Sequence, residues 1–339
     1  MKFWDREKEK EDLKRYLQSE PNAILFVYGP KSSGKSTLLM ESIKDLSRRK
    51  LLRKKYEIHW YDLRGKLVAS YRDVIDALFE AEDTEAGRFV SSVESEMGLS
   101  IPMVMGFKVK KSLREEFYNK VSDPFGYMEA VMRRSGKRQI IVFDELQKLK
   151  GIYMNGQREF VVELFNFFVR ITKVMHLAHV FVMTSDTFFI EEIYTSSALK
   201  NTSEFYLVDY FDDKTALKIL IDEGLSEEDA RYVVEQIGGV PWMMERVLSN
   251  GNAREKVEEL YLQHRARLED VLAESYENGE YESVIETLKK VLSGNIDIIK
   301  DRKMVRKLAE REVLFFDPIN RVVKFQTRLD ERAAKELIS

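Results

Sequence analysis

Residues 24–43 read ILFVYGPKSSGKSTLLMESI, and this stretch decides the fold. An apolar run of strand-forming residues ends at Gly29, a loop of small and basic residues follows, and a helix-like stretch begins near Lys35. The loop, residues 29–36, matches the pattern G-x-x-x-x-G-K-[ST] in full. Because a strand precedes the pattern and a helix follows it, we interpret the loop as a phosphate-binding loop (P-loop) rather than a chance glycine-rich turn.

The chemistry of phosphate explains the residue types in this loop. Glycines let backbone N–H groups approach the phosphate oxygens, and the helix that follows adds its positive N-terminal end. We expect Lys35 to reach the β- and γ-phosphates, Ser36 to offer its hydroxyl to Mg²⁺, and Thr37 to contact the α-phosphate. The residues predicted to bind the nucleotide here are Gly29, Pro30, Lys31, Ser32, Ser33, Gly34, Lys35, Ser36 and Thr37.

A second motif, QIIVFDELQKL at residues 139–149, supplies what hydrolysis needs beyond phosphate binding. Its apolar run ends in Asp144 and Glu145, at the carboxyl end of a predicted buried strand, where ligands of open α/β sheets bind. We expect Asp144 to hold Mg²⁺ through water and Glu145 to polarise the attacking water as a general base. The alternative is two surface acids that cap a strand, which the neighbouring P-loop disfavours.

Another strand ends HVFVMTSD at residues 179–186. Its polar end predicts that Thr184 or Ser185 senses the γ-phosphate or orients the attacking water. The alternative is a helix N-cap, in which Ser185 or Asp186 caps the next helix. Both interpretations stay open, and they are compatible with each other.

Apolar strands alternate with helices through the first part of the chain. We predict strands over 23–28, 56–63, 139–143, 179–184 and 204–208. Such strands, separated by helices, predict an α/β domain with a parallel sheet covered on both faces, which we assign to residues 1–208. Residues 83–122 interrupt the alternation. We interpret them as an inserted hairpin or extended arm, whose Met and Phe side chains are more typical of a core than of an exposed contact surface.

After residue 210 the pattern becomes helical. Short amphipathic helices are predicted over 214–223, 227–237 and 241–248, followed by a long charged helix over 253–276. Two more helices, a hairpin around residues 317–320 and a last helix close the chain. We therefore predict a helical lid domain over 209–275 and a winged-helix domain over 276–339.

Composition narrows the classes of function. A chain of 339 residues is long enough for two or three domains. The net charge of −3 gives no global attraction to nucleic acid, so any such binding needs a local patch. Two basic stretches, 48–55 and 133–138, lie before predicted strands and are more typical of solvated surface. The absence of cysteine excludes disulfides and cysteine-bound zinc. We expect a cytoplasmic protein without membrane spans, because the N-terminus is charged and lacks an apolar signal core.

Together these residues resemble the archaeal ATPase family of P-loop proteins, which is related to STAND and AAA+ ATPases and to origin-recognition initiators. The specific matches are GPKSSGKST and VFDELQKL. FWDREKEKEDL (3–13) resembles the family's opening segment, and this implies that Arg6 lies near the nucleotide base. GGVPWMM (238–244) resembles a lid segment, which implies that Pro241 packs near the adenine. The tail, VLFFDPINRVVKFQTRLDE (313–331), resembles the closing winged helix.

The chain also departs from this family. Many relatives carry an arginine near the end of the fourth strand, or before the fifth, that completes a neighbour's site. Here the fourth strand ends Thr184-Ser185-Asp186, and Lys200 stands before the fifth. Lysine lacks the arginine fork, which argues against activation by an arginine finger from a second copy. Nucleotide-dependent self-association is left open, and the tail has no histidine to serve as a STAND-type phosphate sensor.

The sequence thus predicts a P-loop NTPase that binds and hydrolyses ATP with Mg²⁺ and acts as a nucleotide-driven conformational switch, slow without a partner. ATP is favoured over GTP by the resemblance, and no N-K-x-D motif occurs. The alternative is an ATP-regulated DNA-binding initiator or mobile-element-type protein that uses its winged helix. A small-molecule kinase is disfavoured by the Asp-Glu pair and the long helical C-terminal half. The winged helix leaves a DNA partner and a protein partner both open.

Overall fold

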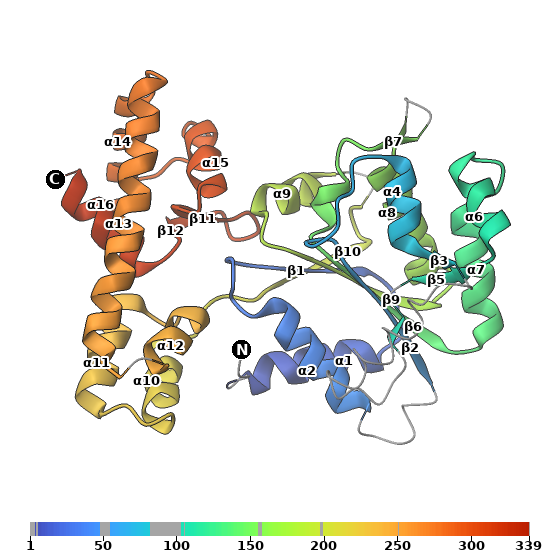
Figure 1. Cartoon of the computed structure of the whole chain (residues 1–339), viewed down its shortest axis with the longest axis horizontal. Coiled ribbons are helices and arrows are strands. Elements are labelled where there is room, and N and C mark those ends of the chain that lie inside the picture. The colour runs from blue at the N-terminus through green and yellow to red at the C-terminus, as the bar shows by residue number, and fades with distance from the viewer. Residues whose placement is uncertain are drawn as a thin grey trace.

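The computed structural model describes residue 4 and residues 6–47, 55–81, 103–104, 106–154, 158–196, 199–249 and 251–338. Figure 1 shows two parts side by side: a sheet covered by helices, and a helix-rich part built from the C-terminal third of the chain. Within the described ranges, no helix is both long enough and apolar enough to cross a membrane.

A six-stranded parallel sheet forms the centre of the first part, in the order β10-β1-β9-β6-β2-β4. The strands are β1 (Ile24–Tyr28), β2 (Tyr56–Asp62), β4 (Met103–Val104), β6 (Arg138–Asp144), β9 (Ala178–Thr184) and β10 (Ser203–Leu207). All five predicted strands are therefore confirmed. Because all strands are parallel, the carboxyl ends of β1, β2, β6 and β9 meet at one edge of the sheet. The P-loop follows β1 and the Asp144-Glu145 pair stands at the end of β6, so both motifs lie at this edge.

Helices cover both faces of this sheet, as the apolar strands require. On one face, α1 (Glu7–Gln18) and α2 (Lys35–Ser47) pack on alternate strand residues such as Leu25 and Val27. On the other face, Phe26 belongs to a larger aromatic cluster. The helices that cover this face are α4 (Tyr71–Leu78), α7 (Pro124–Ser135), α8 (Phe160–Val169) with a π-helical end (Arg170–Val174), and α9 (Thr187–Thr195).

Local sequence signals explain several helix boundaries. The Ser70 side chain accepts a hydrogen bond from the Asp73 amide, and the Asp73 carboxylate accepts one from the Ser70 amide, so α4 begins with a capping box. Helix α11 begins after Ser226, whose hydroxyl accepts a hydrogen bond from the Asp229 amide. Pro241 is the first residue of α12, where its missing N–H removes no helical bond.

The predicted insertion differs from expectation in its described part. A hairpin would pair its two strands with each other, but β4 pairs in parallel with β2, and β5 (Phe107–Val109) pairs in parallel with β3 (Phe79–Ala81). Phe107 is buried and stacks on His59 at 4.2 Å between ring centroids, which confirms the core assignment for this residue. Helix α6 (Lys111–Tyr118) follows. The rest of the insertion, residues 83–102 and 105, and most of the basic stretch 48–55 lie outside the described residues.

The C-terminal part follows the predicted order of helices and hairpin. Its elements are α10 (Asp213–Asp222), α11 (Glu227–Ile237), α12 (Pro241–Leu248), α13 (Ala253–Glu277), α14 (Tyr281–Leu292), α15 (Arg302–Glu310), β11 (Leu314–Asp317), β12 (Val322–Phe325) and α16 (Arg328–Leu337). Helices α14 and α15 with the antiparallel β11–β12 hairpin form the winged-helix arrangement. Helix α13 packs against α11, α12, α14 and α16, so the lid and the winged helix share one apolar core. The domain limits 208/209 and 275/276 stay predictions.

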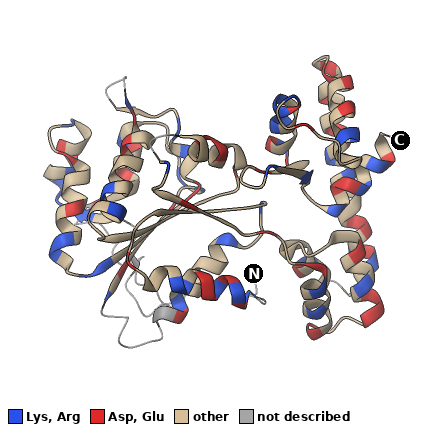
Figure 2. Cartoon of the chain, turned by 180° about the vertical axis from the view of Figure 1, so that it is seen from behind, with Lys and Arg blue, Asp and Glu red and all other residues tan. Residues whose placement is uncertain are grey.

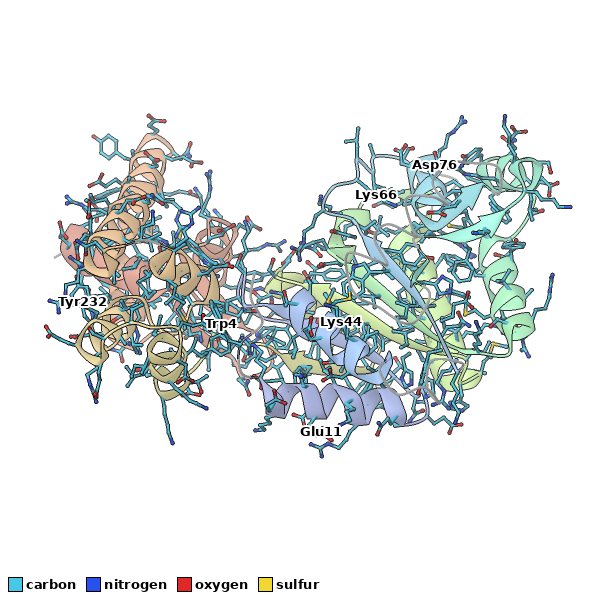
Figure 3. All side chains as sticks on the ribbon, turned by 60° about the horizontal axis from the view of Figure 1, so that its bottom comes forward. Trp4, Glu11, Lys44, Lys66, Asp76 and Tyr232 are labelled. Atoms are coloured by element: carbon cyan, nitrogen blue, oxygen red, sulfur yellow. The ribbon has the colours of Figure 1, made fainter. Side chains whose placement is uncertain are left out.

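The two parts touch along the edge of the sheet that carries the motifs. Tyr28, the last residue of β1, donates a hydrogen bond to Asp317 in the hairpin at 2.9 Å. Phe188 of α9 packs with Val305 and Phe316 of the winged helix. Figure 3 places Trp4 at the junction of the two parts, where its indole N–H donates to Glu223 of the lid at 3.1 Å. The short η1 helix (Leu146–Leu149) and the β7–β8 pair (Tyr153–Met154, Arg158–Glu159) complete the sheet domain.

Candidate functional site

The P-loop leaves β1 through a backbone turn that only glycine fits. Gly29 has a φ of 148°, and a Cβ atom at this position would lie 2.2 Å from the carbonyl oxygen of Val208. Helix α2 starts at Lys35, and the Leu38 amide bonds to the Gly34 carbonyl at its first turn. The loop is therefore held between β1 and the segment after β10, at the N-terminus of α2, as a phosphate site requires.

Lys35 is buried within this loop. Its Nζ donates to the carbonyl oxygens of Pro30 at 2.8 Å and Gly29 at 3.1 Å. Burial lowers the pKa of Lys35 to about 8, although Glu145 and Asp144 both favour the charged form. The ammonium group thus has little water around it and two exchangeable carbonyl partners, which prepares it to bind a phosphate oxygen.

Ser36 and Asp144 meet across the sheet edge. The Ser36 hydroxyl, from the first turn of α2, donates to Asp144 Oδ2 at the end of β6 over 2.8 Å. Asp144 is almost fully buried, with 3% of its side chain exposed. A hydroxyl beside a carboxylate is an oxygen donor set of the kind Mg²⁺ prefers, and these two residues fit the predicted metal position.

Glu145 sits beside this pair in a strained backbone conformation. Its φ is 65° and its ψ is 44°, in the left-handed region. Its amide donates to the carbonyl of Met183, so the β6–β9 pairing fixes this turn. Its carboxylate accepts a hydrogen bond from Gln147 at 2.6 Å and is mostly buried. A carboxylate fixed next to the Asp144–Ser36 pair is placed to accept a proton from a water molecule.

One cavity of about 640 Å³ joins these groups. It is bounded by the P-loop, by the ends of β6 and β9, and by the winged helix. Its lining is Pro30, Lys31, Ser32, Gly34, Lys35, Ser36, Thr37, Arg64, Glu145, Gln147, Lys148, Ser185, Asp186, Thr187, Phe188, Ala309, Glu310, Glu312, Leu314, Phe315 and Gln326. Seven of the nine predicted P-loop residues line the cavity. The other two, Gly29 and Ser33, contribute backbone carbonyls that accept hydrogen bonds from Lys35 and Arg6.

Sequence reasoning missed Arg64, which follows β2. Its Nη2 lies 2.9 Å and 3.0 Å from the two oxygens of Asp144 and 3.2 Å from Ser36 Oγ. The signal was available, because β2 ends at the same edge as β6 and Arg64 is the second residue after β2. The family resemblance implied an activating arginine only near the fourth and fifth strands, and Arg64 follows the second.

The two candidates at the end of β9 have different surroundings. Ser185 lines the cavity. Thr184 is fully buried, and its hydroxyl accepts a hydrogen bond from the Asp186 amide at 2.9 Å. Asp186 is the N-cap of α9 and accepts from the Phe189 amide, so the capping alternative is realised by Asp186. The predicted phosphate-sensing role remains a prediction, for which the placement favours Ser185 over Thr184.

Arg6 reaches the P-loop from the start of α1. It donates to the carbonyl oxygens of Ser33 at 2.8 Å and Asp209 at 2.9 Å, and its guanidinium lies over the Phe211 ring at 4.5 Å. Together with Tyr206, Tyr210 and other residues it lines a second cavity of about 510 Å³. A planar ligand group next to the P-loop could be held by this aromatic and cationic wall.

Pro241 is placed differently from what the resemblance implies. It is buried in the lid core and lines neither cavity. Gly239 of the same segment pairs with Phe211, which lines the second cavity. Its first-turn position in α12 explains the proline without a ligand.

Two basic features lie away from the cavity. Lys200 precedes β10 at the opposite edge of the sheet from the P-loop, since Ile24 at the start of β1 pairs with Ser203. The stretch 133–138 also leads into the start of a strand, β6, at that opposite edge. Nucleotide-dependent self-association stays a prediction.

Known proteins resemble this chain in sequence and in fold. A family model described as an ATPase domain predominantly from Archaea matches residues 3–247. An "uncharacterized ATP-binding protein" of Methanocaldococcus jannaschii is 36% identical over 350 residues, covering 100% of this chain and 98% of the relative. A similarly described protein of Pyrococcus abyssi is 34% identical over 349 residues, covering 99% and 98%.

Solved structures share the fold at low sequence identity. A Walker-type ATPase of Pyrococcus abyssi matches with a TM-score of 0.62 at 16% identity, over 98% of this chain and 96% of the other. The ORC2 protein of Aeropyrum pernix, solved as ADPNP–ADP complexes, matches with a TM-score of 0.52 at 12% identity, over 99% and 94%. Since the family model covers most of the chain and the archaeal relatives match it from end to end, the chain belongs to the family of ATPase domains found predominantly in Archaea.

Proposed function

We propose that the protein is a Mg²⁺-dependent ATPase that uses ATP binding and hydrolysis as a conformational switch. The observation that carries this proposal is the 2.8 Å contact between Ser36 and Asp144, with Glu145 beside it in the wall of the P-loop cavity. ATP as the nucleotide is supported by the description of the relatives as ATP-binding proteins.

Four residues at the P-loop cavity have roles in this proposal. Lys35 exchanges its loop carbonyls for the β- and γ-phosphates and neutralises part of their charge. Ser36 and Asp144 hold the metal, which when bound neutralises charge that develops on the phosphate oxygens. Glu145 takes the proton of the attacking water, and the β6–β9 pairing holds its backbone at the cavity wall.

Contacts between the winged helix and the P-loop support the switch part of the proposal. Glu312, between α15 and β11, pairs with Lys31 of the P-loop at 2.5 Å. Gln326 donates to the hydroxyl of Tyr210, which itself donates to the carbonyl of Lys31. A change in the loop when phosphate binds or leaves is therefore passed directly to the C-terminal part, and this is the physical basis we propose for the switch.

ATP hydrolysis by the purified full-length chain tests the proposal. Glu145→Gln removes the proton acceptor but keeps the side-chain shape, so turnover should fall about 10²-fold or more while ATP stays bound. Lys35→Ala should abolish binding itself. The control is Glu163→Gln on α8, whose carboxylate pairs with Arg158 outside the cavity and which should hydrolyse ATP like wild type. Wild-type turnover by Glu145→Gln would overturn the role of Glu145.

A second candidate function is ATP-regulated binding of DNA through the winged helix. The observation that favours it is the basic exposed side of α15, seen as blue in Figure 2, beside the β11–β12 hairpin. The cations are Arg302, Lys303, Arg306, Lys307 and Arg311, and each pairs with a carboxylate of the same chain. DNA would have to displace these pairs, so we rank this function second.

Fluorescence anisotropy with labelled duplex DNA separates the two functions. A DNA-binding function predicts affinity that falls steeply as salt rises from about 50 to about 200 mM, because phosphate contacts release counterions. It also predicts weaker binding by Lys303→Ala, since Lys303 is among the exposed cations of α15. Absence of binding at low salt, with ATP or with ADP, would exclude this second function.

A further inference from the structure

Arg64 combines a fixed backbone with a partly free side chain. Its carbonyl and that of Leu63 both accept hydrogen bonds from Lys148, at 2.8 Å and 3.0 Å, and its amide donates to Asp62 at 2.9 Å. The Leu63 amide also bonds to the Asp144 carbonyl. The side chain, by contrast, is 52% exposed and lines the nucleotide cavity. The base of this side chain is therefore anchored to the cavity wall, while its guanidinium can turn.

The guanidinium lies where the metal is predicted to bind. One nitrogen, Nη2, is within 3.2 Å of Ser36 Oγ and within 3.0 Å of both Asp144 oxygens. The Nε atom is 3.7 Å from Glu145. A buried carboxylate needs a positive partner, and in this structure Arg64 supplies it. The same cation thus contacts both predicted metal ligands and the predicted general base.

A guanidinium and a divalent cation cannot share these ligands. Two positive groups within a few ångströms repel each other, and Asp144 offers only two carboxylate oxygens. If the metal takes the ligands, the side chain of Arg64 must leave them. Its anchored backbone keeps it at the cavity, where the planar guanidinium matches the oxygens of a phosphate group.

We propose that Arg64 acts as a tethered cation that occupies the metal position of the nucleotide-free protein, is displaced by Mg²⁺, and then binds the terminal phosphate of ATP from within the same chain. This proposal rests on the proposed function, since it assigns a further residue to the same site. Arg64 would thus provide, from within the same chain, the activating arginine that is absent at the end of the fourth strand and before the fifth. It also gives Glu145 two states, because the Arg64 Nε atom lies 3.7 Å from this carboxylate only while Arg64 stays near Asp144.

The first test measures binding of a non-hydrolysable ATP analogue with and without Mg²⁺. Without metal, Arg64 screens Asp144 from the phosphates, so Arg64→Ala should bind the analogue more weakly. With metal, Arg64→Ala loses the contact with the terminal phosphate, but it also has no guanidinium that competes with Mg²⁺ for Asp144, so the net loss should be smaller. The quantity compared is the affinity for the analogue with Mg²⁺ divided by the affinity without Mg²⁺. We expect this ratio to be about tenfold higher in Arg64→Ala than in wild type, which corresponds to a difference of about 1.4 kcal/mol in binding free energy.

Two further variants make this test specific. Arg64→Lys retains the charge and should stay closer to wild type in its Mg²⁺ dependence than Arg64→Ala. Arg231→Ala in α11, whose side chain pairs with Glu227 on the lid surface, controls for the loss of one arginine. A merely structural role of Arg64 predicts that both affinities fall by the same factor and the ratio stays unchanged, and this result would overturn the proposal.

The second test needs no nucleotide and therefore survives a failure of the proposed function. Free Mn²⁺ is titrated by electron paramagnetic resonance in the presence of the nucleotide-free full-length protein. We expect Arg64→Ala to bind Mn²⁺ several-fold more tightly than wild type, and Asp144→Asn in the same background to remove that gain. Equal or weaker Mn²⁺ binding by Arg64→Ala would show that Arg64 does not compete for the metal ligands. If Arg64→Ala binds Mn²⁺ more tightly but the wild-type protein never hydrolyses ATP, the ATPase proposal is refuted. The competition between Arg64 and the metal ion would still be supported.

Discussion

Backbone geometry at single residues decides what the cavity can do. At Gly29 the chain turns with a φ of 148° against the Val208 carbonyl, and the Val208 amide bonds back to Tyr28 at 2.8 Å. At Glu145 the left-handed conformation stores strain of about 1 kcal/mol, which the sheet maintains through the Met183 carbonyl. The first residue sets the path of the P-loop, and the second sets the position of the carboxylate.

Gly29→Ala should damage the P-loop and the fold together. The added Cβ would meet the Val208 oxygen at 2.2 Å, and neither backbone segment can move without breaking the β1–β10 pairing. We expect a loss of at least about 2 kcal/mol in the free energy of unfolding, measured by urea denaturation, and loss of ATP binding. Gly251→Ala, where a Cβ meets no atom within 4 Å, is the matched control. Equal stability of the two variants would show that the turn tolerates a side chain.

At the scale of elements, regular periodicity made most of the fold predictable. The five apolar strands and the helices after residue 210 occur where apolar runs and helical spacing placed them. The edge strand β4 and the parallel β3–β5 pair were not predictable, because strands of two or three residues carry too little pattern to show which neighbour they pair with. The same limit applies to the site: the P-loop and the Asp144-Glu145 pair are local motifs, whereas Arg64 reaches them only through the β2–β6 pairing.

A buried histidine in strand β9 should make stability depend on pH. His179 lies beside the ring of Tyr16, at 5.4 Å between ring centroids, and burial, helped by the charge of Arg138, lowers its pKa to about 3. An unfolded histidine titrates near about 6.5, so between these values only the unfolded chain binds the proton. The stability from neutral His179 is therefore full above about pH 6.5 and is lost progressively as pH falls toward 3.

Urea unfolding of wild type and His179→Phe at two pH values measures this contribution. Between pH 7 and pH 5, protonation of His179 in the unfolded chain should lower the free energy of unfolding of wild type by about 2 kcal/mol. The phenylalanine variant keeps an aromatic ring at this position and should not show this decrease. The comparison uses each protein's own change with pH, so a packing defect in the variant cancels. Parallel pH dependence in the two proteins would show that His179 is protonated in the folded state.

At the scale of the whole molecule, a buried carboxylate joins the two parts. Glu191 of α9 is almost fully buried and contacts Arg302 at the start of α15 at 2.7 Å and Arg321 in the hairpin at 2.8 Å. Together with the Lys31–Glu312 pair, these contacts hold the winged helix against the cavity. A nucleotide that alters this arrangement acts on a contact that combines these ion pairs with the small apolar cluster of Phe188, Val305 and Phe316, and such a contact can separate and re-form more readily than a large apolar core.

Glu191→Gln should loosen this docking without unfolding the sheet domain. Arg302 and Arg321 are about half exposed, so water can solvate them once the carboxylate is gone, and the loss should be about 1 kcal/mol, taken from the contact between the parts. Hydrogen exchange followed by mass spectrometry should show faster exchange in α15 and in the β11–β12 hairpin, with β6 unchanged. Glu163→Gln, which removes a carboxylate from α8 outside this contact, serves as the control. Unchanged exchange in α15 would mean that Glu191 does not hold the winged helix in place.

The most direct measurement of the proposed switch is the distance between the two parts in each nucleotide state. The chain has no cysteine, so Val174→Cys in the sheet domain and Ile299→Cys before α15, both exposed positions, can carry spin labels. In the Glu145→Gln background, double electron–electron resonance should give different distance distributions with Mg²⁺-ATP and with Mg²⁺-ADP, and adding Lys35→Ala should remove the difference. Identical distributions in a protein that binds both nucleotides would contradict the switch.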